Sequence, residues 1–221
     1  MQLTTLILDF DGTIADTNAC ILATFNASFE ALGLPVPAAE AITPLIGLPL
    51  GEMFERLTGS KEPCFIQQCI DMYHLLFPNT SKESVRLFDG VGETLHALKQ
   101  RGLAIAIATS RGRDSLDLLL HRLGIGELFD MMVCLEDVSN KKPAPDMVIS
   151  ILHHLHKAAD EALVVGDTVF DIEMGKRAGC LTCGVTYGNQ TRQQLQQQAP
   201  DFIVDAFPML LQLPPFAAPI A

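Results

Sequence analysis

The stretch LILDFDGTIAD, residues 6–16, decides the fold of this chain. Its apolar residues 6–8 lead directly into Asp9 and Asp11, with Gly12 behind them. A short apolar run that ends in acidic residues indicates a buried strand with polar side chains at its carboxyl end. Because Asp9 and Asp11 are two residues apart, both side chains can point the same way at that end. We therefore ask what chemistry needs two carboxylates there.

Composition limits the number of domains and the classes of partner that are expected. The chain has 221 residues, 48% of them hydrophobic, which predicts one or two domains. It carries 15 basic and 26 acidic residues, a formal net charge of -11, and no run of Lys and Arg, so neither nucleic acid nor an anionic membrane is expected as a partner. The first apolar run is far too short to span a bilayer and has no basic start. Six scattered cysteines fit a reducing compartment, so a cytoplasmic protein is expected.

From residue 85 onward, short apolar runs alternate with polar turns and segments of helical period. Strands alternating with helices predict a parallel sheet. The runs are almost wholly apolar and do not alternate, so helices should cover both faces. The sequence thus predicts a Rossmann-like, three-layer α/β core. The predicted strands after the first are residues 103–110, 131–137, 162–168, 182–188 and 201–206.

Residues 15–84 have a different pattern. Helical stretches are expected at 16–32, 50–58 and 63–77, with no convincing buried strand between them. The sequence therefore predicts a small α-helical domain inserted after the first strand of the core. The core would consist of residues 1–14 and 85–221, and the two crossings between the units would let the helical domain open and close.

Polar side chains end the apolar runs of the core as well. Thr109 and Ser110 end the second run, Asp167 ends the fourth, and Asp171 follows one helical turn later. Lys142 lies in the loop after the third run. In open parallel sheets the functional crevice lies beyond the carboxyl ends of the strands. These residues and the first acidic pair are therefore expected to form one site.

The carboxylates of such a site would repel one another unless a cation compensates them. Oxygen ligands on an acidic cluster favour Mg²⁺ over zinc. A lysine beside Mg²⁺ indicates a phosphate ligand. The chain has neither a G-x-x-x-x-G-K-[ST] loop nor a G-x-G-x-x-G turn, which argues against nucleoside triphosphate and dinucleotide binding by those routes.

Four segments resemble, in order, the motifs of the haloacid dehalogenase superfamily: DFDGT, ATS, KKPAPD and GDTVFDIEMGKRAG. The helical insertion after the first motif resembles a cap of that superfamily. The segments IGLPLGEMF, KKPAPD, GVTYG and PDFIVDAFPMLL are similar to phosphoglycolate phosphatases. The resemblance implies a Mg²⁺-dependent phosphatase that hydrolyses a small phosphorylated metabolite through an aspartyl-phosphate.

Carried over to this chain, the resemblance implies that Asp9 is the nucleophile and Asp11 the general acid and base. Thr109, Ser110 and Lys142 would bind the phosphoryl group. Lys142 is favoured over Lys141 because the family places its lysine directly before proline.

The same resemblance implies the metal ligands and the substrate side of the cap. Mg²⁺ would be held by Asp9, the main-chain carbonyl of Asp11, and Asp167. Asp171 would either bind the metal directly or support its ligands. Gly47 and Leu48 are the cap residues expected near the substrate.

Several alternatives stay open at this point. Inorganic pyrophosphatase, sugar-phosphate phosphatase and phosphomutase share the scaffold, although related mutases carry a histidine where this chain has Ile21 and an arginine where it has Leu50. A phospho-accepting receiver domain carries its acidic residues in another order, and dehalogenases lack the second acid of the D-x-D pair. The physiological substrate is not determined, nor is the choice between monomer and homodimer.

Overall fold

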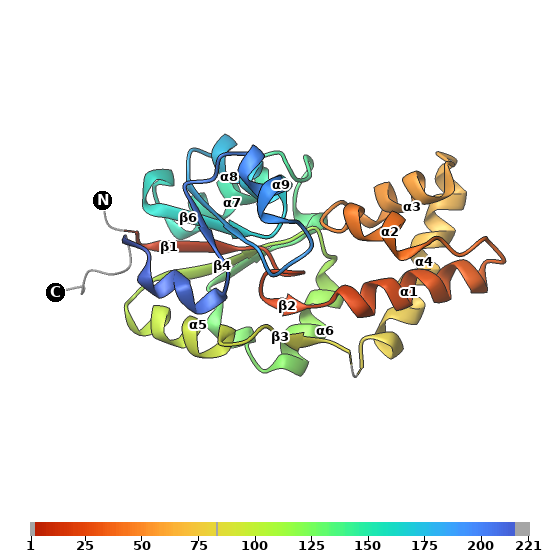
Figure 1. The fold of residues 1–221 in the computed structure, drawn as a ribbon, viewed down its shortest axis with the longest axis horizontal. Helices are drawn as coiled ribbons and strands as arrows, with labels where there is room; N and C mark the ends of the chain where they lie inside the picture. The colour runs from red at the N-terminus through yellow and green to blue at the C-terminus, as the bar shows by residue number, and fades with distance from the viewer. Residues whose placement is uncertain (1–2, 83, 215–221) are drawn as a thin grey trace.

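The structure is a computed structural model that describes residues 3–82 and 84–214. Its core is a six-stranded sheet in the order β5-β4-β1-β6-β7-β8, and every neighbouring pair is parallel. This is the expected Rossmann-like α/β arrangement (Figure 1). The strands are β1 Thr5–Leu8, β4 Ala104–Ala108, β5 Met131–Val133, β6 Ala162–Gly166, β7 Leu181–Val185 and β8 Phe202–Val204.

The strands are shorter at their carboxyl ends than the sequence pattern indicates. The predicted strand 103–110, for example, ends at Ala108, and Thr109 and Ser110 begin the following loop. Those last polar residues leave the ladder, so their side chains are available at the edge of the sheet.

Helices cover both faces of the sheet (Figure 1). Leu6 and Leu8 of β1 belong to the larger hydrophobic cluster with α5 and α6, whereas Ile7 belongs to the cluster that contains α7. Successive strand side chains point to opposite faces, so an unbroken apolar run is buried on both sides. The helices are α5 Val91–Gln100, α6 Arg113–Leu123, α7 Asp146–Leu155, α8 Val169–Arg177 and α9 Arg192–Gln197, and the 3-10 turns of the core are η2 Gly126–Leu128, η3 Leu135–Asp137, η4 Ala159–Glu161 and η5 Phe207–Gln212.

The helical group α1–α4 lies beyond the carboxyl ends of the strands (Figure 1). Its centre is aromatic: the ring centroid of Phe25 lies 4.9 Å from that of Phe54 and 5.1 Å from that of Tyr73. No helix in the described part of the chain is both long and apolar enough to cross a membrane. The elements of the group are α1 Asn18–Ala31, α2 Ala39–Ile42, η1 Thr43–Leu45, α3 Leu50–Thr58 and α4 Pro63–Thr80.

The two chain crossings between the helical group and the core pair with each other. They form the short strands β2, Ala15–Asp16, and β3, Arg86–Leu87, in an antiparallel ladder. The sequence did not predict this pair because two residues are too few to show a period. The ladder ties the two crossings together at the point where the helical group leaves the core.

Candidate active site

Three carboxylates meet at the carboxyl edge of the sheet. Asp9 follows β1, Asp167 follows the neighbouring strand β6, and Asp171 lies in the first turn of α8. One oxygen from each lies within 4.8 Å of the others, and all three residues are buried. Adjacent parallel strands end at the same edge of the sheet, which is why residues 158 positions apart come together here.

Lys142 joins two of these carboxylates. Its Nζ lies 2.6 Å from Asp9 Oδ1 and 2.7 Å from Asp171 Oδ1, and its side chain is 1% exposed. Lys141 points elsewhere and donates hydrogen bonds to the main-chain carbonyls of Leu135 and Val138. Of the two neighbouring lysines, Lys142 is therefore the one that reaches the carboxylates.

Hydrogen bonds hold the remaining carboxylate oxygens in place. Asp171 Oδ2 accepts from the main-chain N-H of Thr168 at 3.1 Å and from its hydroxyl at 2.6 Å, which also caps α8. Asp167 Oδ2 accepts from the main-chain N-H of Asn189 at 2.6 Å and from its side-chain amide at 2.8 Å. Sequence reasoning missed Asn189, since a lone Asn after a strand has the ordinary appearance of a turn residue.

Glycines make room for Asp167. A Cβ atom at Gly12 would lie 2.2 Å from Asp167 Oδ2, and one at Gly188 would lie 2.4 Å from the same oxygen. Gly12 also has a φ of +80°, a region that side-chain-bearing residues rarely adopt. Two glycines therefore close around one carboxylate, and only Gly12 was noted from the sequence.

The electrostatics of this cluster fit a divalent cation. Burial raises the pKa of Asp167 to about 7, and burial together with the neighbouring carboxylates raises that of Asp9 well above its usual range, although Lys142 opposes this. Burial would lower the pKa of Lys142, but Asp171 and Asp9 raise it overall. Ionising all three carboxylates beside one ammonium would leave an excess of negative charge, which an oxygen-ligated Mg²⁺ would compensate.

Asp11 does not join the three clustered carboxylates. Its Oδ2 accepts from Arg111 Nε at 3.0 Å, and its Oδ1 accepts from Arg111 Nη2 at 2.5 Å and from the Thr17 hydroxyl at 2.6 Å. The sequence predicts four carboxylates in one cluster, but among the described residues three meet there, because Arg111 holds the fourth. The role expected for the Asp11 main-chain carbonyl stays a prediction.

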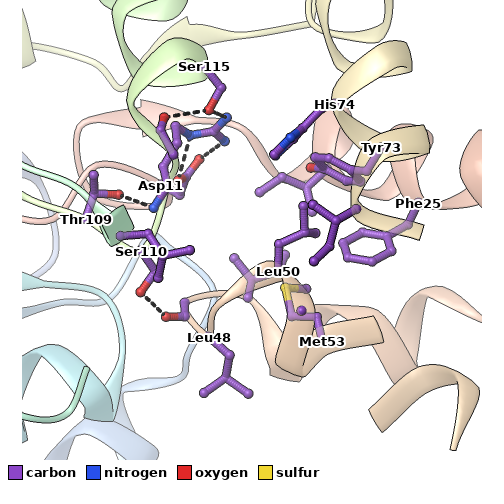
Figure 2. Close-up of a pocket in the computed structure, with 18 of the residues that line it drawn as sticks. Asp11, Phe25, Leu48, Leu50, Met53, Tyr73, His74, Thr109, Ser110 and Ser115 are labelled. Carbon is purple, nitrogen blue, oxygen red and sulfur yellow. Dashed lines mark hydrogen bonds and ion pairs between the residues drawn. The ribbon is translucent and has the colours of Figure 1, made fainter. Parts of the chain in front are cut away.

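A cavity of about 140 Å³ adjoins the carboxylates of Asp9 and Asp11; Figure 2 shows its lining. Asp9, Asp11, Thr109 and Ser110 line its core side. The opposite wall comes from the helical group and is largely apolar. The lining residues of that wall include Ile21, Phe25, Ile46, Leu48, Leu50 and Met53.

The two polar residues after β4 already have partners in this cavity wall. Thr109 Oγ1 accepts from the main-chain N-H of Arg111 at 3.1 Å, and the Ser110 hydroxyl donates to the Gly47 carbonyl at 2.7 Å. Both Gly47 and Leu48, the expected cap residues, line the cavity. Of the sequence-predicted residues, those that line this cavity are Asp9, Asp11, Gly47, Leu48, Thr109 and Ser110, and Ser110 is bonded to the helical group. Lys142, Asp167 and Asp171 do not line it but cluster with Asp9 at its wall.

The profile of the haloacid dehalogenase-like hydrolases matches residues 6–185. The chain is 33% identical to pyrophosphatase PpaX of Bacillus velezensis over 96% of both chains. A protein from Bacteroides fragilis described as a haloacid dehalogenase-like hydrolase has a solved structure that matches with a TM-score of 0.90, 28% identity, and coverage of 95% of this chain and 100% of the other. The structure of a predicted phosphoglycolate phosphatase from Haemophilus somnus matches in fold with a TM-score of 0.90 and 24% identity, over 96% of this chain and 98% of the other.

Proposed function

This chain belongs to the haloacid dehalogenase-like hydrolases, and we propose that it is a Mg²⁺-dependent phosphatase that hydrolyses a small phosphorylated metabolite through an aspartyl-phosphate on Asp9. One observation carries the proposal. Asp9 lies at the wall of the cavity and is paired with buried Lys142. One of its oxygens lies within 4.8 Å of an oxygen of Asp167 and of Asp171, close enough for one ion to bind all three. A carboxylate nucleophile, a fixed cation and a set of oxygen donors for Mg²⁺ are what phosphoryl transfer needs.

In the first step, a carboxylate oxygen of Asp9 attacks phosphorus and the bond from phosphorus to the leaving oxygen breaks. Lys142 orients Asp9 and offsets negative charge, while Thr109 donates a hydrogen bond to a phosphoryl oxygen. Asp11 gives a proton to the leaving oxygen. It then takes a proton from water, which attacks phosphorus, releases phosphate and restores the Asp9 carboxylate.

Asp9, Asp167 and the Asp11 carbonyl would hold the metal, with Asp171 beside them. When bound, Mg²⁺ supplies positive charge at the phosphoryl oxygens. Attack on phosphorus, protonation of the leaving oxygen and activation of water are carried out by side chains of this chain.

We propose further that residues 15–84 act as a cap over a core of residues 1–14 and 85–221. The apolar wall from the helical group, with Gly47 and Leu48 in it, supports this division because it closes the cavity above the catalytic edge. Ligand sites commonly have volumes of about 300–1,000 Å³. The cavity of about 140 Å³ is smaller, which favours a substrate of few atoms.

Two small phosphate compounds are candidate substrates for a cavity of this size. The motif resemblance favours phosphoglycolate, and the similarity to proteins named pyrophosphatase PpaX, 33% identical in one case, favours inorganic pyrophosphate as the second candidate. Hydrolysis is favoured over phosphoryl transfer to a sugar because Ile21 and Leu50 line the cavity. Their aliphatic side chains offer no hydrogen bonds to hold a sugar phosphate in two orientations.

The test is turnover of phosphoglycolate, pyrophosphate and glucose 1-phosphate with Mg²⁺, together with the mass of acid-quenched enzyme. We expect release of inorganic phosphate and an enzyme fraction heavier by one phosphoryl group, which Asp9→Asn lacks. If Asp9→Asn retains turnover or the added mass, Asp9 is not the nucleophile. Formation of glucose 6-phosphate faster than free phosphate would instead indicate a mutase.

A further inference from the structure

Arg111 brings a positive charge to the wall of the cavity at Asp9. Its side chain is only 7% exposed, although it lines the cavity. Among the described residues that line this cavity, it is the only Arg or Lys. It follows Thr109 and Ser110, and the proposed steps of phosphoryl transfer do not use it.

The surroundings of Arg111 hold its guanidinium in one orientation. Nε and Nη2 donate to the two oxygens of Asp11, and Nη1 donates to the Ser115 hydroxyl at 3.3 Å. The guanidinium carbon lies 4.8 Å from the centre of the Phe77 ring, within reach of a cation-π contact. A fork fixed in this way matches the planar geometry of a carboxylate or the paired oxygens of a phosphate.

Resting on the proposed phosphatase function, we propose that Arg111 binds a second anionic group of the substrate, and that the Asp11 carboxylate occupies this position until substrate arrives. The substrate class is then a phosphate compound with a second oxyanion close to the transferred group. That oxyanion is either a carboxylate, as in phosphoglycolate, or a second phosphate, as in pyrophosphate.

The exchange gives both residues a use in turnover. Leaving a nearly buried guanidinium without a paired carboxylate costs much free energy. The Asp11 carboxylate therefore leaves Arg111 most readily when another anion takes its place. Substrate with two anions therefore releases the Asp11 carboxylate for proton transfer, whereas a phosphate ester with a neutral tail leaves Asp11 on Arg111. The contact between Arg111 and the second anion would thus both select two-anion substrates and free Asp11 for proton transfer.

A simpler role for Arg111 is to hold the loop after β4 by its bonds to Asp11 and Ser115. Binding of non-hydrolysable phosphonates in Mg²⁺ separates the two roles. The probes are 3-phosphonopropionate, which ends in a carboxylate, methylenediphosphonate, which ends in a second phosphonate, and propylphosphonate, which ends in a methyl group. Calorimetric titration gives the ratio of each two-anion affinity to the propylphosphonate affinity.

We expect wild-type protein to bind one of the two-anion probes at least about tenfold more tightly than propylphosphonate. The tighter of the two identifies the second group as carboxylate or phosphate. Arg111→Met should reduce that ratio to near one. Arg113→Met is the matched control, because Arg113 lies two residues away and pairs with Asp137 outside the cavity, so its ratio should equal that of wild type.

Asp11→Asn tests the exchange from the other side. It removes the competing carboxylate and leaves Arg111 in place, so the ratio should rise above the wild-type ratio. This measurement stands even if Arg111→Met does not fold. A wild-type ratio near one, or an unchanged ratio in Asp11→Asn, would overturn the proposal. Failure of the proposed function is distinct, since wild-type protein would then hydrolyse neither p-nitrophenyl phosphate nor any other phosphate compound with Mg²⁺.

Discussion

The Ser110 hydroxyl donates a hydrogen bond of 2.7 Å to the main-chain carbonyl of Gly47 and so joins the loop after β4 to the loop before α3. The first loop belongs to the core and the second to the helical group. Gly47 adopts a φ of +104°, which a residue with a side chain rarely does, and this conformation presents its carbonyl to Ser110. A residue expected at the phosphate thus links the two halves of the cavity.

Ser110→Ala should weaken this link. We expect the free energy of unfolding to fall by about 1 kcal/mol, and KM for p-nitrophenyl phosphate to rise a few-fold with kcat within twofold of wild type. Ser84→Ala is the control, since the exposed Ser84 hydroxyl donates to the Thr80 carbonyl and does not line the cavity. A tenfold loss of kcat at unchanged KM would show instead that Ser110 acts on the phosphoryl group itself.

Removal of Mg²⁺ should abolish turnover, because Asp9, Asp167 and Asp171 then face one another with Lys142 as the one cation paired to them in the described part of the chain. Adding Mg²⁺ back should restore the rate of p-nitrophenyl phosphate hydrolysis. It should also raise Tm, since the ion binds the folded protein and relieves repulsion among buried carboxylates. Hydrolysis at the full rate in excess chelator would contradict the metal assignment.

Lys142→Met should lower the free energy of unfolding by about 3–5 kcal/mol, because it leaves Asp9 and Asp171 buried without their cation. Chemical denaturation measures the change. Lys141→Met is the matched control and should cost less, since Lys141 bonds only main-chain carbonyls in the described structure. Equal losses from the two variants would mean that the buried ion pairs contribute little.

Gly12→Ala should inactivate the protein, because its Cβ would lie 2.2 Å from Asp167 Oδ2 and displace that carboxylate. Gly33→Ala separates this clash from backbone strain. Gly33 also has a positive φ, +67°, but a Cβ there meets nothing within 4 Å, so the cost should be roughly 1–2 kcal/mol of stability with activity unchanged. Full activity and Mg²⁺ affinity in Gly12→Ala would show that the Asp167 position is not needed.

Asp11→Asn should slow substrates with poor leaving groups more than p-nitrophenyl phosphate, whose phenolate needs little protonation. We expect the loss of kcat/KM to be greater by about 10²-fold or more for phosphoglycolate, whose second anion frees Asp11 from Arg111 in wild-type protein, than for p-nitrophenyl phosphate. Equal losses on both would remove the acid and base role from Asp11. The test uses a two-anion substrate with a poor leaving group, because a substrate with a neutral tail would leave the Asp11 carboxylate on Arg111.

Local pattern was enough to predict most of the fold. The apolar runs that form β1, β4 and β6 are unbroken, and the repeat Leu116, Leu119, Leu120 marks one buried face of α6. The ladder of β2 and β3 and the four-residue helix α2 were missed. Elements of two to four residues show no period, and their pairing depends on chain segments far away in sequence.

The sequence by itself determined which residues end the strands, and parallel pairing then brings Asp9, Thr109 and Asp167 to one edge. Only the tertiary structure decided what each side chain contacts there. It directed Lys142 to the carboxylates and Lys141 to main-chain carbonyls. It also placed Asn189 on Asp167 and paired the Asp11 carboxylate with Arg111. The physical reason is that the positions of strands along the chain follow from local hydrophobicity, whereas the partner of a charged group depends on which opposite charge the packed chain brings within about 3 Å of it.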